Sequence, residues 1–239
     1  MFQHPKILVG VITAQPYAYC LDAFCASLKG IDYRHFDALF VDNSVGDDYL
    51  NVIKTKGYMV VKGPHTESVK ERLVNSRNIL RDYFLKHDYD YFFSVEQDVI
   101  VPSHVLTTLV AHNKQIVSGV YFKLIDATLT KGGRAVKKTK ALMPLLYDFA
   151  PKEIKNKMRW MNYKDVQGDK LILIKACGLG CVLIHRDVLE KIAFTVRKQE
   201  SGFDDVWFCE EALNKGFTLY ADTGIKCKHL TSQKGKRLF

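Results

Sequence analysis

The sequence lacks the features that would assign it to a membrane-spanning or secreted class. No stretch approaches the roughly 18 consecutive apolar residues of a membrane span. The first residues, Met-Phe-Gln-His-Pro-Lys, lead into the apolar run 7–12, which is too short and wrongly flanked for a signal peptide. No internal repeat and no linker between independent domains can be identified. These absences favour a cytoplasmic location, with peripheral contact to a membrane left open.

Cysteines are few and are not concentrated in loops. The six cysteines, at positions 20, 25, 177, 181, 209 and 227, are scattered through predicted strands and helices. Without a secretory signal, buried free thiols are expected rather than a disulfide framework. A zinc site formed by Cys177, Cys181, Cys227 and His229 is disfavoured, because the first two lack the usual Cys-x2-Cys spacing.

Positive charge is in excess. The chain has 35 lysines and arginines against 26 acidic residues, a net charge of +9, much of it in segments 131–140 and 226–237. This balance suits phosphorylated ligands, nucleic acid or an anionic membrane surface, but solvated basic loops would explain it equally well. The tyrosines and phenylalanines lie in apolar strands rather than among basic residues, so no nucleic acid partner is expected.

The first half of the chain alternates predicted strands and helices. We expect strands at 6–13, 37–42, 58–61, 89–98 and 115–122, and helices at 19–28, 47–56 and 67–86 and from about 102. This order predicts an α/β fold with a doubly wound, mainly parallel sheet and helices on both faces. Ligands of such sheets bind beyond the carboxyl ends of the strands.

The second half is less regular. Residues 126–140 are basic, contain a Gly-Gly pair and are predicted to form a mobile loop. Residues 144–175 show little periodicity apart from a strand at 170–175. Further strands are expected at 178–184 and 217–221, with helices at 186–192 and from Asp204 to Gly216.

Two carboxylates close the apolar strand predicted at 89–98. Glu96 and Asp98 are spaced i, i+2, so on a strand they would point to the same side. Adjacent carboxylates repel each other and resist burial unless a hard divalent cation lies between them. The pair therefore indicates a cation that holds a diphosphate, although a solvated strand end is an equally simple explanation.

Six motifs, in their order along the chain, resemble those of GT-A-type glycosyltransferases, most closely glycosyltransferase family 2 and the related Anp1-like mannosyltransferases. The motifs are Val-Gly-Val-Ile-Thr-Ala at 9–14, Val-Asp-Asn-Ser at 41–44, Asn-Ser-Arg-Asn at 75–78, Glu-Gln-Asp at 96–98, Gly-Leu-Gly-Cys at 178–181 and Asp-Asp-Val-Trp-Phe at 204–208. They span nearly the whole chain. The departure is Glu96, which replaces the first aspartate of the usual Asp-x-Asp.

The resemblance implies a metal-dependent enzyme that transfers a sugar, with inversion, from a UDP- or GDP-linked donor to a hydroxyl of a carbohydrate, lipid or protein. It implies one GT-A-like catalytic domain over 1–239, with a nucleotide-binding half at 1–122 and a less regular acceptor-side half and basic tail at 123–239. Two alternatives are a nucleotide-sugar-binding protein without transfer activity and a sugar nucleotidyltransferase. The second normally has a Gly-rich loop with Arg-Lys near its first strand, which residues 14–18 do not provide.

The resemblance also assigns the cation and donor residues. Asp98 would coordinate Mn2+ or Mg2+, Glu96 would lie near the ribose or the metal, and His229 would be a further ligand; an exposed tail histidine is the alternative. The other expected donor-side residues are Thr13, Ala14, Asp42, Arg77, Asn78, Gly178 and Gly180. Asp42 would accept a hydrogen bond from the base or ribose, and the two glycines would let the backbone approach the sugar. A turn-forming aspartate, a surface arginine and a tight glycine turn are the competing interpretations.

The acceptor side is assigned to the acidic pair that begins the last predicted helix. An inverting transfer needs a carboxylate to take the proton of the acceptor hydroxyl, and the family pattern points to Asp205, with Asp204 orienting it. Helix N-capping is the alternative role. Trp207 would be a sugar platform or a core residue, with the core favoured. The basic loop 126–140, with Lys137, Lys138 and Lys140, would be a lid over the diphosphate or a membrane contact.

Overall fold

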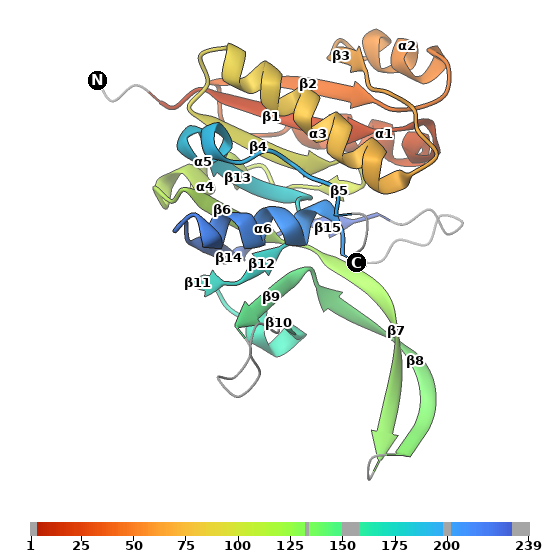
Figure 1. Cartoon of the computed structure of the whole chain (residues 1–239), viewed down its shortest axis with the longest axis vertical. Coiled ribbons are helices and arrows are strands. Elements are labelled where there is room, and N and C mark those ends of the chain that lie inside the picture. The colour runs from red at the N-terminus through yellow and green to blue at the C-terminus, as the bar shows by residue number, and fades with distance from the viewer. Residues whose placement is uncertain (1–3, 132–133, 150–157, 198–201, 231–239) are drawn as a thin grey trace.

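The structure is a computed structural model of the chain and describes residues 4–131, 134–149, 158–197 and 202–230. Its centre is an eight-stranded sheet with the order β11-β14-β6-β13-β4-β1-β2-β3 (Figure 1). These strands are β1 (Ile7–Thr13), β2 (Phe36–Asp42), β3 (Met59–Lys62), β4 (Tyr91–Glu96), β6 (Ile116–Val120), β11 (Leu171–Ile174), β13 (Cys181–His185) and β14 (Leu219–Lys226). Four neighbouring pairs are parallel, and β13 and β11 pair antiparallel with their neighbours. The predicted mainly parallel α/β sheet is confirmed.

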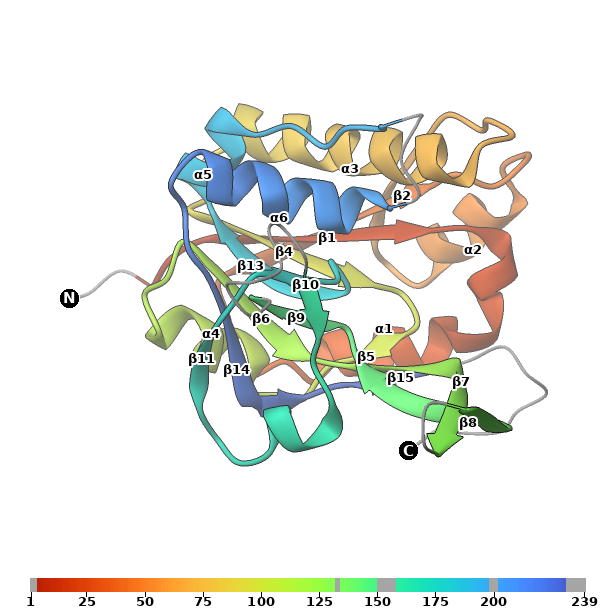
Figure 2. The same ribbon diagram turned by 60° about the horizontal axis from the view of Figure 1, so that its bottom comes forward.

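Helices cover both faces of this sheet. Residues of α1 (Leu21–Lys29), α2 (Asp48–Thr55) and α4 (Val105–Ala111) belong to one apolar cluster. Residues of α3 (Val69–Lys86), α5 (Arg186–Lys191) and α6 (Asp204–Asn214) belong to another, and Figure 2 shows these three helices together on one side. Along β1, Val9 and Val11 join the first cluster and Leu8 the second, because successive strand side chains point to opposite faces.

The longest helix follows from local sequence signals. The Ser68 side chain accepts a hydrogen bond from the Glu71 N–H at the start of α3, and Lys86 lies in the last turn, where a cation favours the helix dipole. The predicted helix at 67–86 is therefore nearly correct. Among the described helices, none combines the length and apolarity that a membrane span would need.

The strand predicted at 89–98 is shorter than expected. β4 ends at Glu96, which lies beside Ile12 of β1, and a turn at 97–98 leads into the short strand β5 (Val99–Ile100). β5 pairs with β15 (Lys228–His229) instead of extending the central sheet. The i, i+2 argument therefore fails for Asp98, because this residue is in the turn and not on the strand.

The prediction of a mobile loop at 126–140 is wrong. Strands β7 (Phe122–Lys131) and β8 (Arg134–Pro144) form an antiparallel ribbon through this segment. Sequence periodicity also missed β9 (Leu146–Phe149), β10 (Met158–Trp160) and β12 (Ala176–Cys177), which form a three-stranded sheet, and the 3-10 helix η2 (Tyr163–Val166). A two-stranded ribbon does not bury one whole face, so the alternation of apolar and polar residues that marks a strand is weak in it.

The packing of β1 against β4 gives the first prediction. A methyl group at Gly10 would lie 2.3 Å from Cε2 of the buried Phe92, so Gly10→Ala should lower the free energy of unfolding by about 1–3 kcal/mol through overpacking. Gly30→Ala is the control, because its methyl group would stay 3.4 Å from the nearest atom and its φ is −84°. Urea unfolding of both variants measures the difference, and equal stabilities would contradict this packing.

Candidate functional site

Polar residues collect at the carboxyl ends of three neighbouring strands. Thr13 ends β1 beside Asp42 at the end of β2, and Glu96 ends β4 on the other side of β1. This is the edge of the sheet at which the sequence placed these side chains. Ala14 follows directly in extended conformation and begins the 3-10 helix η1 (Gln15–Cys20).

The Arg77 side chain connects this edge to α6. It is 3% exposed; its Nε donates to Asp204 Oδ2 at 2.6 Å and its Nη2 to Glu96 Oε1 at 3.2 Å. Nη1 donates to Ser94 Oγ at 2.9 Å. Burial alone would lower the pKa of Arg77, but the charges of Asp204 and Glu96 raise it, so the guanidinium stays charged. Arg77 is therefore not a surface residue, and its contacts join the end of β4 to the start of α6.

Glu96 is held in an environment that disfavours its charge. Burial raises the pKa of Glu96 to about 7 against the opposing charge of Arg77, and the Asp98 charge contributes to the rise. About a third of the side chain, 35%, remains exposed, so it is reachable from the solvent side.

Asp98 and His229 meet although 131 residues separate them. His229 Nε2 lies 3.1 Å from Asp98 Oδ2, and the other ring nitrogen, Nδ1, lies 2.9 Å from the carbonyl oxygen of Phe122. The Leu230 N–H donates to the Asp98 carbonyl at 2.7 Å, so backbone pairing also holds the two segments together. Burial alone would lower the pKa of His229, but Asp98 more than offsets this and the pKa is raised. His229 is thus part of a short strand, not an exposed tail residue.

This pair fits a divalent cation. Because a carbonyl can only accept, Nδ1 carries a proton and Nε2 is the ring atom that faces Asp98. The raised pKa favours a second proton on Nε2 that is donated to Asp98, and a cation between Nε2 and Asp98 would replace that proton. No group of three or more His, Cys, Asp and Glu side chains in the described part of the chain could hold a metal by itself. Two protein ligands are nevertheless what Mg2+ or Mn2+ needs when phosphate oxygens and water supply the rest.

The acidic pair of α6 divides into two environments. Asp204 is buried and its carboxylate accepts from Arg77. Asp205 is partly exposed and accepts a 2.8 Å hydrogen bond from the Val206 N–H. Burial raises the pKa of Asp205, and the Asp204 charge adds to the shift. Asp205 is therefore the more accessible carboxylate of the two, and its pKa lies above the ordinary value of an aspartate. The adjacent Trp207 is buried, which supports the core interpretation of this residue.

Two residues that were expected to contact the nucleotide-sugar donor use their polar side-chain atoms in hydrogen bonds within the protein. Asp42 is fully buried and accepts from the Ser44 N–H at 3.0 Å and from Lys62 Nζ at 2.9 Å, so it forms the turn that was the competing interpretation. The Asn78 amide donates to the Phe194 carbonyl and accepts from the Phe194 N–H. In this arrangement both residues position the backbone around the site.

The glycines at 178 and 180 make room for a tyrosine that the sequence did not suggest. A methyl group at Gly178 would lie 2.2 Å from the Tyr121 hydroxyl oxygen, and one at Gly180 would lie 2.7 Å from Tyr121 Cζ and 2.9 Å from a Glu96 oxygen. The Gly180 N–H donates to the Tyr121 hydroxyl at 3.0 Å, and the Tyr121 ring packs edge-on against His229. The absence of a side chain at these two glycines therefore lets Tyr121 pack against His229.

Other residues at the site also escaped the sequence analysis. Gln97, between the two acids, is buried and hydrogen-bonds Thr13, the Tyr17 carbonyl and the Tyr49 hydroxyl, which fixes the turn from behind. The stacked rings of Tyr17 and Tyr19 are 41% and 46% exposed. Burial and the Asp98 charge raise the pKa of both tyrosines, which places them beside the acidic turn. Adjacent exposed aromatics after a first βα turn were a detectable signal.

Comparisons with known proteins identify the fold. No protein-family model matches the sequence, and no curated protein matches it. The solved structure of GalNAc-T7 with UDP, GalNAc and Mn2+ is similar to this chain with a TM-score of 0.65 and 11% sequence identity. The similarity covers 99% of this chain and 46% of the GalNAc-T7 chain. S. aureus TarS 1–349 in complex with UDP-GlcNAc is similar over 97% of this chain and 60% of its own, with a TM-score of 0.55 and 13% identity. The chain thus spans about half the length of these structures, and it shares with them the GT-A fold that its motifs predicted.

The Arg77 contacts generate the second prediction. Arg77→Met leaves Asp204 buried without its counter-charge and should lower the free energy of unfolding by about 3–5 kcal/mol. The Arg77 charge lowers the pKa of Asp205, so removing Arg77 raises the pKa of Asp205 further in the folded protein. The folded variant then binds a proton more readily than the unfolded chain does, and it loses stability as the pH rises. The loss of unfolding free energy in Arg77→Met should therefore be larger at about pH 8 than at about pH 5.5.

Arg81→Met is the matched control for this prediction. Arg81 lies one turn further along α3 and donates to the carbonyls of Leu189 and Ile192 and to the exposed Asp82, so its loss leaves no buried carboxylate without a partner. It should cost about 1–2 kcal/mol, with little dependence on pH. Chemical denaturation at both pH values tests this, and equal, pH-independent losses for the two variants would contradict the role given to Arg77.

Proposed function

We propose that this GT-A-fold chain is a metal-dependent glycosyltransferase that transfers a sugar from a nucleotide-sugar donor to an acceptor hydroxyl. The observation that carries the proposal is the contact between Asp98 and His229 at the carboxyl edge of the sheet, with the His229 ring oriented by the Phe122 carbonyl. It is supported by the fold shared with GalNAc-T7, solved with UDP, GalNAc and Mn2+, and with TarS, solved with UDP-GlcNAc.

Asp98 and His229 Nε2 would hold Mn2+ or Mg2+. A nitrogen ligand suits Mn2+ better than the harder cations. When bound, the cation supplies positive charge that neutralises the departing nucleoside diphosphate. Glu96, exposed by a third and restrained by Arg77, would face the ribose or the cation.

The donor would lie over the ends of β1 and β2, between the acidic turn and the loop that follows Thr13. The exposed rings of Tyr17 and Tyr19 offer the base an aromatic surface at this place, beside Ala14. Asp42 would have an indirect role, because it positions Lys62 and Ser44 by hydrogen bonds. Asn78 would likewise position the backbone of Phe194, to which it is hydrogen-bonded. A UDP- or GDP-linked donor fits these contacts.

Asp205 would be the base of an inverting transfer. The acceptor oxygen forms a bond to the anomeric carbon as the bond to the diphosphate breaks, the bonding pair leaves with the diphosphate, and the hydroxyl proton passes to the Asp205 carboxylate. Burial raises the pKa of Asp205, which makes it a better proton acceptor than an exposed aspartate. Asp204, bonded to Arg77, would orient the start of α6. The acceptor would be a carbohydrate, lipid or protein hydroxyl.

The third prediction concerns the cation. UDP or GDP at about 100 times its dissociation constant should stabilise the protein by about 2.7 kcal/mol, seen as a raised melting temperature, when Mn2+ is present. Asp98→Ala and His229→Ala should remove the Mn2+-dependent part of this shift. His112→Ala is the control, because His112, directly after α4, pairs with Asp222 of β14 at 2.7 Å in the same way. A full Mn2+-dependent shift in Asp98→Ala would exclude the cation site.

The fourth prediction concerns the base. Asp205→Asn should keep the nucleotide-induced melting shift and lose about 10²–10⁴-fold in transfer, measured as nucleoside diphosphate released from UDP- and GDP-sugars with water or methyl glycosides as acceptors. Glu210→Gln, on the exposed side of the same helix, should leave the rate unchanged. A binding protein without activity would show no release in the unsubstituted chain.

The pH dependence of the same rate has a defined sign. The base must be ionised, and burial raises its pKa, so the rate should fall as the pH drops through a value above the ordinary 3.8 of aspartate. A rate that stays constant down to about pH 4 would exclude Asp205 as the base.

A further inference from the structure

The β7–β8 ribbon has no role in the proposed reaction. Its two strands pair with each other and, among the described strands, with none of the others. Figure 1 shows the ribbon extending from the central sheet past β9 and β10. An isolated two-stranded ribbon is marginally stable in water, so contact with another surface would stabilise one of this length.

The ribbon is strongly basic. Residues 122–144 contain five lysines and one arginine against the single acid Asp126. Lys123, Lys138 and Lys140 are exposed, and the register places Asp126 opposite Lys140. A net charge of +5 (six basic residues less one acid) therefore lies on a segment that projects from the fold.

Aliphatic side chains alternate with these lysines. The register places Leu124 opposite Leu142 and Ile125 opposite Ala141, and Leu142 is 38% exposed. Lysine stems lie along apolar surface while their ammonium groups stay in water. The exposed Lys138 and Lys140 beside the exposed Leu142 match a membrane interface, where anionic headgroups lie above apolar chains.

We propose that the β7–β8 ribbon binds an anionic phospholipid surface through the face that carries Lys138, Lys140 and Leu142, with the two lysines on the headgroups and Leu142 at the boundary of the acyl region. Segment 123–143 contains no Phe, Tyr or Trp on which a base could stack, which disfavours single-stranded nucleic acid. The concentration of like charge disfavours edge-to-edge pairing with a second copy of the chain.

The base of the ribbon reaches the candidate cation site. Phe122, the first residue of β7, provides the carbonyl that orients His229, and the preceding Tyr121 packs against the same ring. A ribbon bound to lipid would hold this edge of the sheet near the membrane surface. For the transferase this places a membrane-borne acceptor hydroxyl at the site; that consequence rests on the proposed function, whereas lipid binding does not.

Vesicle sedimentation of the full chain tests the proposal without any measurement of activity. The unsubstituted chain should bind vesicles of phosphatidylcholine with about 30% phosphatidylserine and not vesicles of phosphatidylcholine alone. The variant K138E/K140E should bind the anionic vesicles at least about tenfold more weakly, and Leu142→Asn should weaken the binding that remains at high salt.

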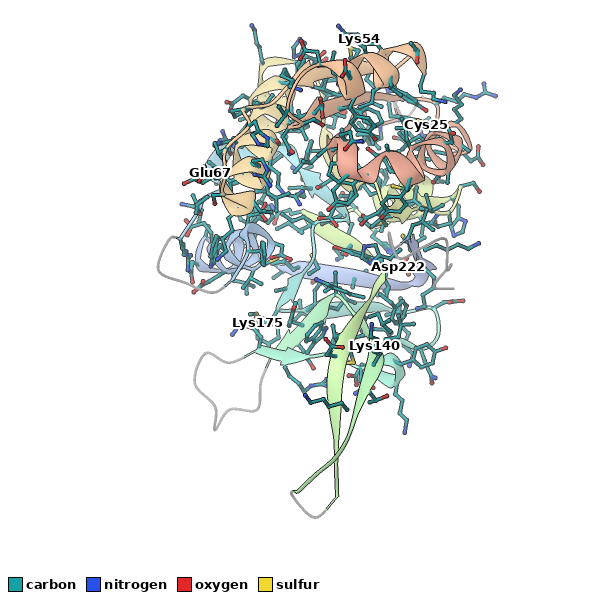
Figure 3. The ribbon with its side chains drawn as sticks, turned by 90° about the vertical axis from the view of Figure 1, so that its right-hand side faces the viewer. Cys25, Lys54, Glu67, Lys140, Lys175 and Asp222 are labelled. Atoms are coloured by element: carbon teal, nitrogen blue, oxygen red, sulfur yellow. The ribbon has the colours of Figure 1, made fainter. Side chains whose placement is uncertain are left out.

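The control variant is K54E/K86E, which changes the net charge equally. Both lysines are exposed, on α2 and α3, and Figure 3 shows Lys54 at the end of the molecule opposite Lys140. Retained binding in this control, with unchanged melting temperatures in all variants, supports the ribbon as the lipid contact. The proposal is overturned by equal losses in both double variants, by equal binding to both kinds of vesicle, or by a dimer that K138E/K140E dissociates.

Discussion

One buried guanidinium constrains the relative positions of the elements that form the candidate site. Arg77 extends from α3 and contacts Asp204 at the start of α6, Glu96 at the end of β4 and Ser94 within β4. A buried charge is stable only when its partners are in place, so these contacts form together or not at all. The proposed donor side, near Glu96, and the proposed acceptor side, near Asp205, are thereby held at a fixed separation by a single side chain.

The cation side is held by backbone pairing instead of charge. β5 and β15 pair antiparallel, the Leu230 N–H bonds the Asp98 carbonyl, and the Phe122 carbonyl orients the His229 ring. Tyr121 fills the space left by Gly178 and Gly180 and supports that ring from behind. The same two residues, Tyr121 and Phe122, begin the basic ribbon, so the proposed lipid contact and the proposed cation site share one structural base.

Local sequence signals predicted the elements that lie in the sheet and its covering helices. The apolar runs of β1, β2 and β4 and the helical spacing of α3 depend on neighbours within a few residues, and burial on both faces makes the pattern strong. The ribbon was mistaken for a loop because lysines occupy register positions on both of its faces, so the alternation of apolar and polar residues is weak. The turn at 97–98 was missed because β4 ends where its pairing with β1 ends, which the sequence of β4 does not show.

Motif order named residues of the candidate site but not the contacts between them. Asp98, His229 and Asp205 were named from motif order, but the partners that define their chemistry are remote in sequence: Arg77 and Asp204 lie 127 residues apart, and Asp98 and His229 lie 131 apart. Asp42 and Asn78 were expected to face the donor, and their engagement by Lys62 and Phe194 depends on tertiary packing.

The central claim is that Asp98 and His229 hold a cation that binds the diphosphate of the donor. Pulsed electron paramagnetic resonance of the protein with Mn2+ and UDP tests this claim most directly. The account predicts couplings to imidazole nitrogen and to phosphorus from one Mn2+, with the nitrogen coupling absent in His229→Ala. A bound Mn2+ that couples to phosphorus and water but to no nitrogen in the unsubstituted chain would contradict it.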